Sequence, residues 1–184
     1  SAIGISETWL TDETQDLVSI SGYKFLSNHR TKKVGGGVGL YVQSDLEHRL
    51  LTNCMFSNPN LIESLFVEII VPNGKNVIIG IVYRPPNHNV ELFMEKFNQI
   101  LFNISKSNKD CYIMGDYNID LFHLDKHSPT QEFVDSLYSH TFYPLINRPT
   151  RITAHSATLI DNILTNNLSF QLSSGIIVNN LSGH

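Results

Sequence analysis

A short apolar run that ends in polar residues constrains the fold more than any other part of this chain. Residues 111–114 are apolar and are followed by Gly115, after which Asp116, Asn118 and Asp120 come at alternate positions. The apolar half is typical of a strand that is buried on both faces of a sheet. Packing does not require the polar half. Because α/β sheets bind ligands at their strand ends, these side chains indicate a site for a hard cation or a phosphate.

Two other interpretations of the same side chains are a calcium loop and a simple polar turn. A calcium loop has glycine at its sixth position and glutamate at its twelfth, where this chain has Leu121 and His127, so that loop is excluded. A simple polar turn stays open, because Asp and Asn favour turns through hydrogen bonds of their own side chains.

The length and composition indicate one globular domain that covers residues 1–184. The apolar share of 41% and the charged share of 16% exclude a disordered chain. No apolar run approaches the roughly 20 residues that cross a bilayer, so no membrane association is expected. The chain begins without methionine inside a strand-like segment, and we expect it to be a fragment of a longer protein.

Charge and cysteine content narrow the class of protein further. The net charge of −4 is not that of a strongly basic nucleic-acid binder, so any such contact must come from local basic patches. Cys54 and Cys111 lie in apolar surroundings without metal-like spacing. We expect both to be buried free thiols in a reducing compartment.

Hydrophobic periodicity predicts alternating strands and helices, and therefore a mixed α/β sandwich. An apolar stripe predicts a helix over residues 89–107, and Asn73-Gly74 predicts a hairpin between strands 64–71 and 77–83. Further strands are expected at 2–5, 23–27, 40–42, 111–114, 143–146, 159–164 and 176–178, and further helices at 11–18 and after Ser128.

The glycine run 35–39 suggests a phosphate loop, but its spacing fits neither nucleotide fingerprint. The residues after it favour a strand rather than a helix whose N-terminus would hold phosphate. The glycines are therefore expected to relieve crowding at a strand start or bulge.

Polar residues follow several of the predicted strands. Glu7 is compatible with a helix start or a metal ligand, and Arg84 with a phosphate clamp or a solvated side chain. Asp161 interrupts an apolar run, although aspartate is rarely buried unless it is paired. Strand ends from one domain can converge on one site. The polar residues at the predicted strand ends are Glu7, Tyr83 with Arg84, Asp116 with Asn118, Asp161, and His184.

Six segments occur in an order that resembles the endonuclease/exonuclease/phosphatase superfamily. Within it, the resemblance is closest to the endonuclease domain of non-LTR (LINE-type) retrotransposon polyproteins, and it covers essentially the whole chain. The segments are Ser-Glu-Thr-Trp-Leu (6–10), Gly-Gly-Gly-Val-Gly (35–39), Tyr-Arg-Pro-Pro (83–86), Gly-Asp-Tyr-Asn (115–118), Ile-Asp-Asn-Ile (160–163) and Ser-Gly-His (182–184).

This resemblance implies a four-layer α/β sandwich of the deoxyribonuclease I type. It implies hydrolysis of double-stranded DNA that depends on Mg²⁺, with Mn²⁺ as a substitute. In such an element the nick supplies the 3′-hydroxyl that primes reverse transcription. A reverse transcriptase domain in the parent polyprotein and a location in the nucleus or cytoplasm are implied in the same way.

The resemblance also implies a role for each matching catalytic residue. Glu7 would ligate the metal, and Asp116 would orient or deprotonate the attacking water. Asn118 would hold the phosphate or that water. Asp161 would fix the tautomer of His184, which would face the scissile phosphate.

Substrate contacts are implied for a second group of residues. Tyr83 would line the phosphate pocket, and Arg84 beside it would bind the substrate. Thr158 and the Thr150-Arg151 pair would touch the DNA backbone.

The sequence departs from the family pattern at both ends. The N-terminal strand that carries a metal-site asparagine is absent, Gly183 stands where the family has aspartate, and the final strand is absent. The expected fold therefore lacks terminal strands. A catalytically impaired fragment that keeps only the fold or a binding role is the alternative. Hydrolysis of a small phosphate ester is a third interpretation.

Overall fold

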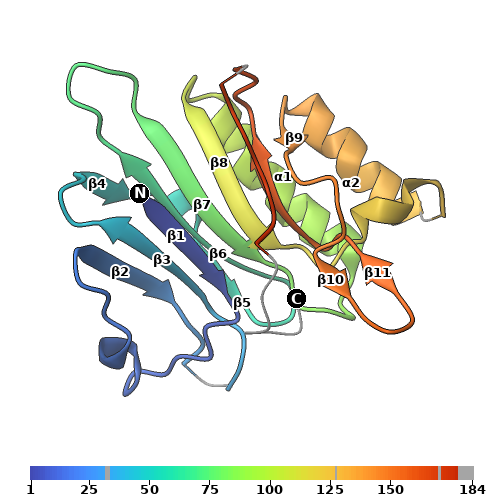
Figure 1. Ribbon diagram of the computed structural model, residues 1–184, viewed down its shortest axis with the longest axis horizontal. Coiled ribbons are helices and arrows are strands. Elements are labelled where there is room, and N and C mark those ends of the chain that lie inside the picture. The colour runs from blue at the N-terminus through green and yellow to red at the C-terminus, as the bar shows by residue number, and fades with distance from the viewer. Residues whose placement is uncertain (32–33, 127, 170, 178–184) are drawn as a thin grey trace.

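Two β-sheets lie face to face, and two helices cover the other side of the larger sheet (Figure 1). The structure, a computed structural model, describes residues 1–31, 34–126, 128–169 and 171–177, apart from the side chains of 124–126. The strands are β1 (Ala2–Ser6), β2 (Tyr23–Asn28), β3 (Val38–Gln43), β4 (His48–Leu50), β5 (Phe56–Asn58), β6 (Ile62–Ile69), β7 (Val77–Tyr83), β8 (Asp110–Asp116), β9 (Tyr143–Pro144), β10 (Arg151–Ile152), β11 (Ala157–Thr158) and β12 (Asp161–Thr165). The helices are α1 (Val90–Ser105) and α2 (Ser128–Ser139), with 3-10 turns η1 (Gln15–Leu17), η2 (Thr52–Cys54) and η3 (Leu121–Lys126).

Strand order places β7 and β8 at the centre of the larger sheet. That sheet runs β4-β6-β7-β8-β12-β9, and β5 also pairs with β6. The smaller sheet runs β1-β3-β2, and β10 and β11 form a separate hairpin. The strands β7 and β8 are parallel and are connected through α1, whereas the other described pairs are antiparallel. This mixed topology confirms the predicted α/β class.

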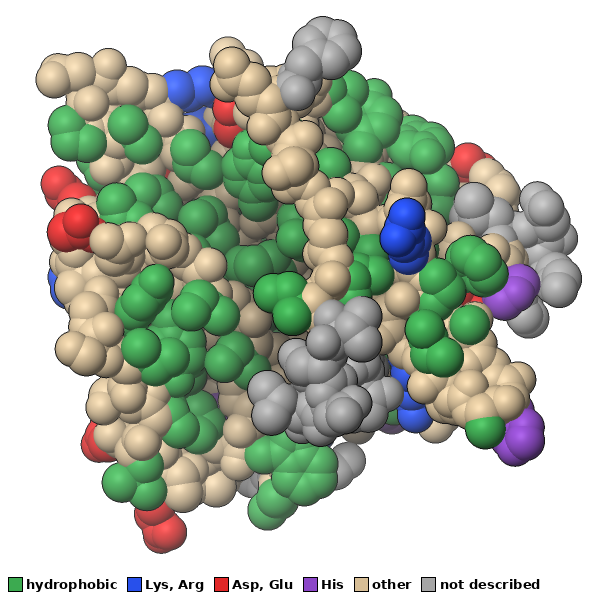
Figure 2. Space-filling view, viewed as in Figure 1, with side chains coloured by type: hydrophobic (Ala, Val, Ile, Leu, Met, Phe, Trp, Pro, Cys, Tyr) green, Lys and Arg blue, Asp and Glu red, His purple; other side chains and the backbone are tan. Residues whose placement is uncertain are grey.

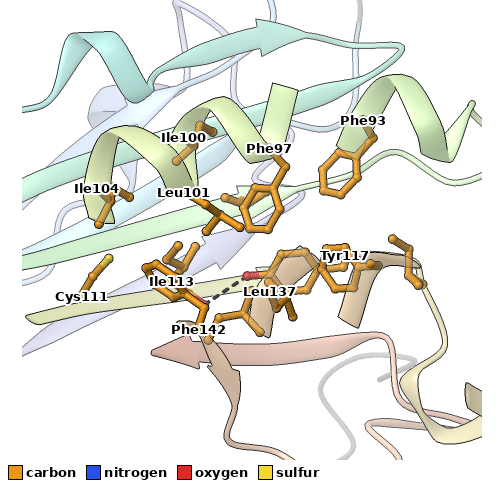
Figure 3. Packing of buried hydrophobic residues seen from close by; sticks show 14 of the residues in the cluster. Phe93, Phe97, Ile100, Leu101, Ile104, Cys111, Ile113, Tyr117, Leu137 and Phe142 are labelled. Atoms are coloured by element: carbon orange, nitrogen blue, oxygen red, sulfur yellow. Dashed lines mark hydrogen bonds between the residues drawn. The ribbon is translucent and has the colours of Figure 1, made fainter. Parts of the chain in front are cut away.

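Helix α1 forms where the apolar stripe predicted it. The side chain of Asn89 caps its N-terminus by accepting a hydrogen bond of 2.9 Å from Leu92 N. One face of the helix is fully buried and packs on Cys111 and Ile113 of β8 (Figure 3). The buried side chains of that face are Phe93, Phe97, Ile100, Leu101 and Ile104.

A second apolar core lies between the two sheets. Side chains of β3, among them Leu40 and Val42, pack against Leu65, Val67 and Ile81 of the larger sheet. The described residues thus form three layers, namely the small sheet, the large sheet and the helices. The outer face of the small sheet carries Tyr41, whose hydroxyl group donates a hydrogen bond to Val18 O.

Three expectations about secondary structure were wrong. The segment 11–18 contains only the single turn η1. Strand β1 is not buried on both faces, because Ile3, opposite Tyr41, and Ile5 point to the outer face of the small sheet, and they are 41% and 39% exposed. Figure 2 shows hydrophobic side chains on the surface over this part of the molecule. Ile176 and Ile177 are not in a strand, and Val178 lies outside the described residues.

Both cysteines are buried free thiols, as the sequence predicted. Burial raises the pKa of the Cys54 thiol to about 11, so it stays protonated and unreactive near neutral pH. In the described part of the chain, neither helix is long and apolar enough to span a membrane.

A buried carboxylate in β6 stabilises the end of the sheet opposite the strand ends that carry the predicted site residues. Glu68 is 1% exposed and accepts hydrogen bonds from Arg49, Asn76 and Lys109. Burial by itself raises the pKa of this carboxyl group, but the three donors outweigh burial and lower it to about 2. Ionised Glu68 therefore favours the folded state.

We expect Glu68→Gln to lower the free energy of unfolding by about 2 kcal/mol at pH 7, because Arg49 and Lys109 lose their partner. A lowered folded-state pKa contributes stability above the unfolded-state pKa of about 4.3, and this is lost as the pH falls towards 2. The difference between parent and variant should therefore shrink between pH 5 and pH 2 in urea unfolding experiments. A difference that stays constant with pH would contradict the assigned role of this carboxylate.

Candidate active site

Three polar side chains predicted from the sequence lie in one row across the large sheet. In the parallel pair β7–β8, Tyr83 is opposite Asp116, and in the antiparallel pair β8–β12, Asp116 is opposite Asp161. Paired residues of neighbouring strands point to the same face of a sheet. The three side chains therefore share the face that is turned towards the small sheet, where Tyr83 is part of the core between the sheets.

Glu7 joins this row from the small sheet. It follows β1 directly, and its carboxylate accepts a hydrogen bond of 2.7 Å from the hydroxyl group of Tyr83. Its φ of 54° is in the left-handed region that non-glycine residues adopt at a cost in energy. The structure thus brings Glu7, Tyr83, Asp116 and Asp161 to the same end of the two sheets.

Tyr83 is a hydrogen-bond donor at neutral pH. Burial raises the pKa of its hydroxyl group, and the negative charges of Glu7 and Asp116 raise it further. The protonated hydroxyl group therefore fixes the Glu7 carboxylate rather than repelling it.

The turn after β8 is fixed by its own residues. Asn118 has a φ of 47°, its backbone N–H donates to Asp116 Oδ1 over 3.0 Å, and its side-chain amide donates to Arg84 O over 2.8 Å. Gly115 permits the close approach of β7, since a Cβ atom there would lie 2.2 Å from Val82 O. Between the two site residues, Tyr117 is fully buried and donates to Ile113 O, which anchors the turn in the core (Figure 3).

The third member of the alternating set has a different role. Asp120 accepts hydrogen bonds from Phe122 N, Leu159 N and the His123 ring. Burial alone raises the pKa of the Asp120 carboxyl group, but these hydrogen bonds lower it below its usual value. Asp120 thus stabilises the loop, and the interpretation of the stretch as a simple turn applies to this residue.

Arg84 lies beneath the turn instead of in solvent. Its side chain is buried, and its guanidinium group donates to Asn118 O over 3.0 Å and to His88 O. Burial lowers the pKa of Arg84, while the charge of Asp116 opposes that change. These contacts connect the buried Arg84 side chain to the Asp116–Asn118 turn and so help to position that turn.

The segment before β12 is bound to the start of that strand. The Thr150 hydroxyl group accepts hydrogen bonds from Ile160 N and Asp161 N, over 3.3 Å and 3.2 Å. Thr158 is opposite Arg151 in the β10–β11 hairpin, where Arg151 is exposed. Thr150 therefore lies next to Asp161, and the other two belong to the adjoining hairpin. His184 is outside the described residues.

A buried ion pair adjoins the row and was missed by sequence reasoning. Glu63 in β6 is opposite Tyr83, is 1% exposed, and forms an ion pair with Arg30. Its other carboxylate oxygen accepts from Gly37 N over 2.8 Å. The β6–β7 hairpin is symmetric about Asn73, and this symmetry pairs residue 63 with residue 83. A hairpin centred on Asn73 was therefore the signal in the sequence that places Glu63 beside Tyr83.

The glycine run supports Glu7 and does not form a phosphate loop. Gly35, Gly36 and Gly37 all have positive φ values, between 65° and 98°. The carbonyl groups of Gly37 and Gly36 accept hydrogen bonds from Thr8 N and Trp9 N. These glycines therefore have a structural role: their backbone carbonyl groups hold the segment that follows Glu7.

The donor set fits a hard divalent cation. Within the described ranges, no three His, Cys, Asp or Glu side chains already form a metal cluster. Three carboxylates nevertheless lie at the same end of the two sheets, from Glu7 after the small sheet and from Asp116 and Asp161 on the large one. Magnesium needs only one or two carboxylates, because water and substrate phosphate complete its octahedron. A cavity of about 270 Å³ adjoins Asp161 and is also lined by Ser6 and Thr150.

Several solved structures share this fold. The chain is similar to the endonuclease domain of TRAS1, a telomere-specific non-LTR retrotransposon, with 13% identity, a TM-score of 0.61, and coverage of 79% of this chain and 67% of that one. It is similar to the catalytic domain of Xenopus laevis APE2, with 16% identity, a TM-score of 0.63, and coverage of 90% and 73%. It is also similar to the human Nocturnin catalytic domain, with 15% identity, a TM-score of 0.61, and coverage of 90% and 68%.

Sequence comparison gives the family. No curated protein matches the sequence of this chain. The profile of the Endonuclease/Exonuclease/phosphatase family matches residues 2–182, which is nearly the entire chain. Together with the shared fold, this match confirms the resemblance read from the six segments: the chain belongs to the endonuclease/exonuclease/phosphatase family.

Proposed function

We propose that this chain is the DNA endonuclease domain of a non-LTR retrotransposon and that it nicks double-stranded DNA by metal-dependent hydrolysis. The observation that carries the proposal is the row of Tyr83, Asp116 and Asp161, to which Glu7 is bound from the second sheet. The fold shared with the TRAS1 endonuclease domain supports the choice of DNA and of a retrotransposon. A reverse transcriptase domain in the parent polyprotein is the proposed partner.

The proposed reaction is the attack of water on a phosphodiester. Asp116 orients the water and takes its proton as a new P–O bond forms and the bond to the 3′ oxygen breaks. Asn118 holds the phosphate or the water through the second N–H of its side-chain amide, since the first donates to Arg84 O and fixes the orientation of the side chain. The leaving oxygen takes up a proton and becomes the 3′-hydroxyl group that primes reverse transcription.

Glu7 is the proposed ligand of Mg²⁺, or of Mn²⁺ in its place. The hydrogen bond from Tyr83 orients the Glu7 carboxylate, and the left-handed backbone at Glu7 presents it beyond the end of β1. When bound, the cation offsets the negative charge that builds on the phosphate. Tyr83 also lines the phosphate pocket.

Asp161 is proposed to fix the tautomer of His184, so that one ring nitrogen faces the scissile phosphate. The hydrogen bonds from Ile160 N and Asp161 N to Thr150 hold the backbone in front of Asp161. Arg151 and Thr158 are proposed contacts of the DNA backbone, and the exposure of Arg151 supports this role. Arg84 is proposed to act on substrate binding through the turn that it supports.

Plasmid nicking tests the proposal. With Mg²⁺, the 184-residue chain should convert supercoiled plasmid to the open-circular form. EDTA should abolish the conversion, and excess Mg²⁺ should restore it, because phosphodiester hydrolysis here requires the cation. Nicking that persists in EDTA would contradict metal dependence.

The same assay separates the two other interpretations. A plasmid that is shifted in a gel but stays supercoiled with Mg²⁺ would replace the endonuclease by a DNA-binding fragment. Intact DNA together with hydrolysis of a small phosphate ester would indicate a phosphatase.

A further inference from the structure

One large aromatic side chain is exposed directly beside the candidate active site. Trp9 is the single tryptophan of the chain, and its side chain is 61% exposed. It follows Glu7 by two residues. Tryptophan is highly buried on average in folded proteins, so an exposed one beside polar site residues calls for a ligand.

The backbone of Trp9 is rigidly held. Trp9 N donates to Gly36 O over 2.9 Å, and Thr8 N donates to Gly37 O over 3.2 Å. Gly37 is in turn held by the buried carboxylate of Glu63. A flexible segment would relax out of the left-handed conformation, yet the φ of Trp9 is 53°. The fold therefore maintains an unfavourable backbone conformation that keeps this ring in solvent.

The indole ring lies near Gly35 and is largely in solvent. A Cβ atom at Gly35 would lie 3.9 Å from two atoms of the ring, which is ordinary contact distance. Gly35 has a φ of 98°, so this position favours glycine for a conformational reason as well. Glycine at position 35 therefore places no side chain against the ring.

The position of Trp9 indicates what it contacts. Two residues span at most about 7 Å, so the ring is attached within that distance of Glu7. This is the rise of about two nucleotides along one DNA strand. If Glu7 holds the cation at the scissile phosphate, as proposed, a ring attached within that distance of Glu7 can reach the bases next to the scissile bond. Aromatic side chains bind bases by stacking on their faces.

We propose that Trp9 stacks on an unpaired or unstacked nucleobase next to the scissile phosphate. This inference rests on the proposed function and adds a preference to it. In a continuous duplex both faces of each base are covered by its neighbours, so the ring gains contact only where a base is unpaired or a step opens. The chain should therefore bind single-stranded or locally opened DNA more tightly than a continuous duplex.

The fluorescence of Trp9 reports on this contact without background from another tryptophan. We expect a short single-stranded oligonucleotide, titrated in EDTA so that no cleavage occurs, to quench the fluorescence saturably. Trp9→Ala, followed by fluorescence anisotropy of a labelled strand, should weaken binding about tenfold. Its effect on the continuous duplex of the same sequence should stay within about twofold.

Two further variants serve as controls. Trp9→Phe keeps a ring and should retain most of the affinity. Phe102→Ala removes a ring that is 51% exposed near the C-terminal end of α1, the end of the helix away from the site, and should change neither affinity. Saturable binding without quenching, or equal affinities of Trp9→Ala and Phe102→Ala for the single strand, would overturn the proposal.

The outcome is separable from that of the proposed function. Quenching with a tenfold loss in Trp9→Ala, but no plasmid nicking with Mg²⁺, would retain the stacking contact and reject the hydrolysis. Metal-dependent nicking without quenching by either DNA would retain the hydrolysis and reject the contact.

Discussion

Asp116→Asn should lower the rate of plasmid nicking by about 10²- to 10⁴-fold, the range that general acid–base catalysis contributes. The amide keeps the size of the side chain and keeps an oxygen that accepts the hydrogen bond from Asn118 N. It does not take a proton from water. The rate should be measured with Mg²⁺ in excess, and circular dichroism should show that the variant remains folded.

The same substitution at the other end of β8 provides a matched control. Asp110 is paired with Lys75 over 2.8 Å, and both side chains are partly exposed. Exposed pairs contribute between 0 and about 1 kcal/mol, so Asp110→Asn should leave both stability and nicking nearly unchanged. If the two variants nick DNA at equal rates, Asp116 is not the group that activates the water.

Local patterns were sufficient to predict much of the fold. The apolar stripe that predicted residues 89–107 corresponds to α1, Val90–Ser105, because a three- to four-residue repeat has a single helical solution. The Asn-Gly pair predicted the hairpin that β6 and β7 form. The end of β8 followed from the change of an apolar run into Asp116 and Asn118, because a buried strand does not require those polar groups.

Features that depend on distant neighbours were not predictable in this way. The apolar residues Ile3 and Ile5 suggested a buried strand, but burial depends on what packs against β1, and these two residues lie on the outer face of the small sheet. Arg84 follows a strand in the sequence, which does not reveal that its guanidinium group turns under the Asn118 loop. The partner of Glu63 lies 33 residues away in sequence, at Arg30.

The Glu63–Arg30 pair connects the stability of the sheets to the geometry of the site. Both side chains are nearly buried, with exposures of 1% and 9%. Glu63 also holds Gly37, and the glycine run holds the segment after Glu7. Removal of Glu63 therefore has two separate effects: a guanidinium group loses its counter-charge, and the support of the candidate metal ligand is loosened.

Glu63→Ala should lower the free energy of unfolding by about 3–5 kcal/mol, because it leaves Arg30 buried without a counter-charge. The double variant Glu63→Leu with Arg30→Met replaces the pair by apolar groups of similar volume and should recover most of that loss. Urea unfolding followed by circular dichroism measures both. Nicking by the double variant should nevertheless stay at least about tenfold below the parent, because a misplaced site group is costly even when the fold is intact.

The Glu68→Gln variant is the control for this experiment, since it removes a buried carboxylate of the same strand at the opposite end of the sheet. It should lose stability but nick DNA at the parental rate below its unfolding temperature. Full recovery of nicking in the double variant would show that Glu63 acts through stability alone. Low nicking in a stable double variant, together with normal nicking by Glu68→Gln, would instead show that Glu63 positions Glu7. Of these two glutamates, Glu63 is the one that is bonded to the glycine run, and that run holds the segment after Glu7.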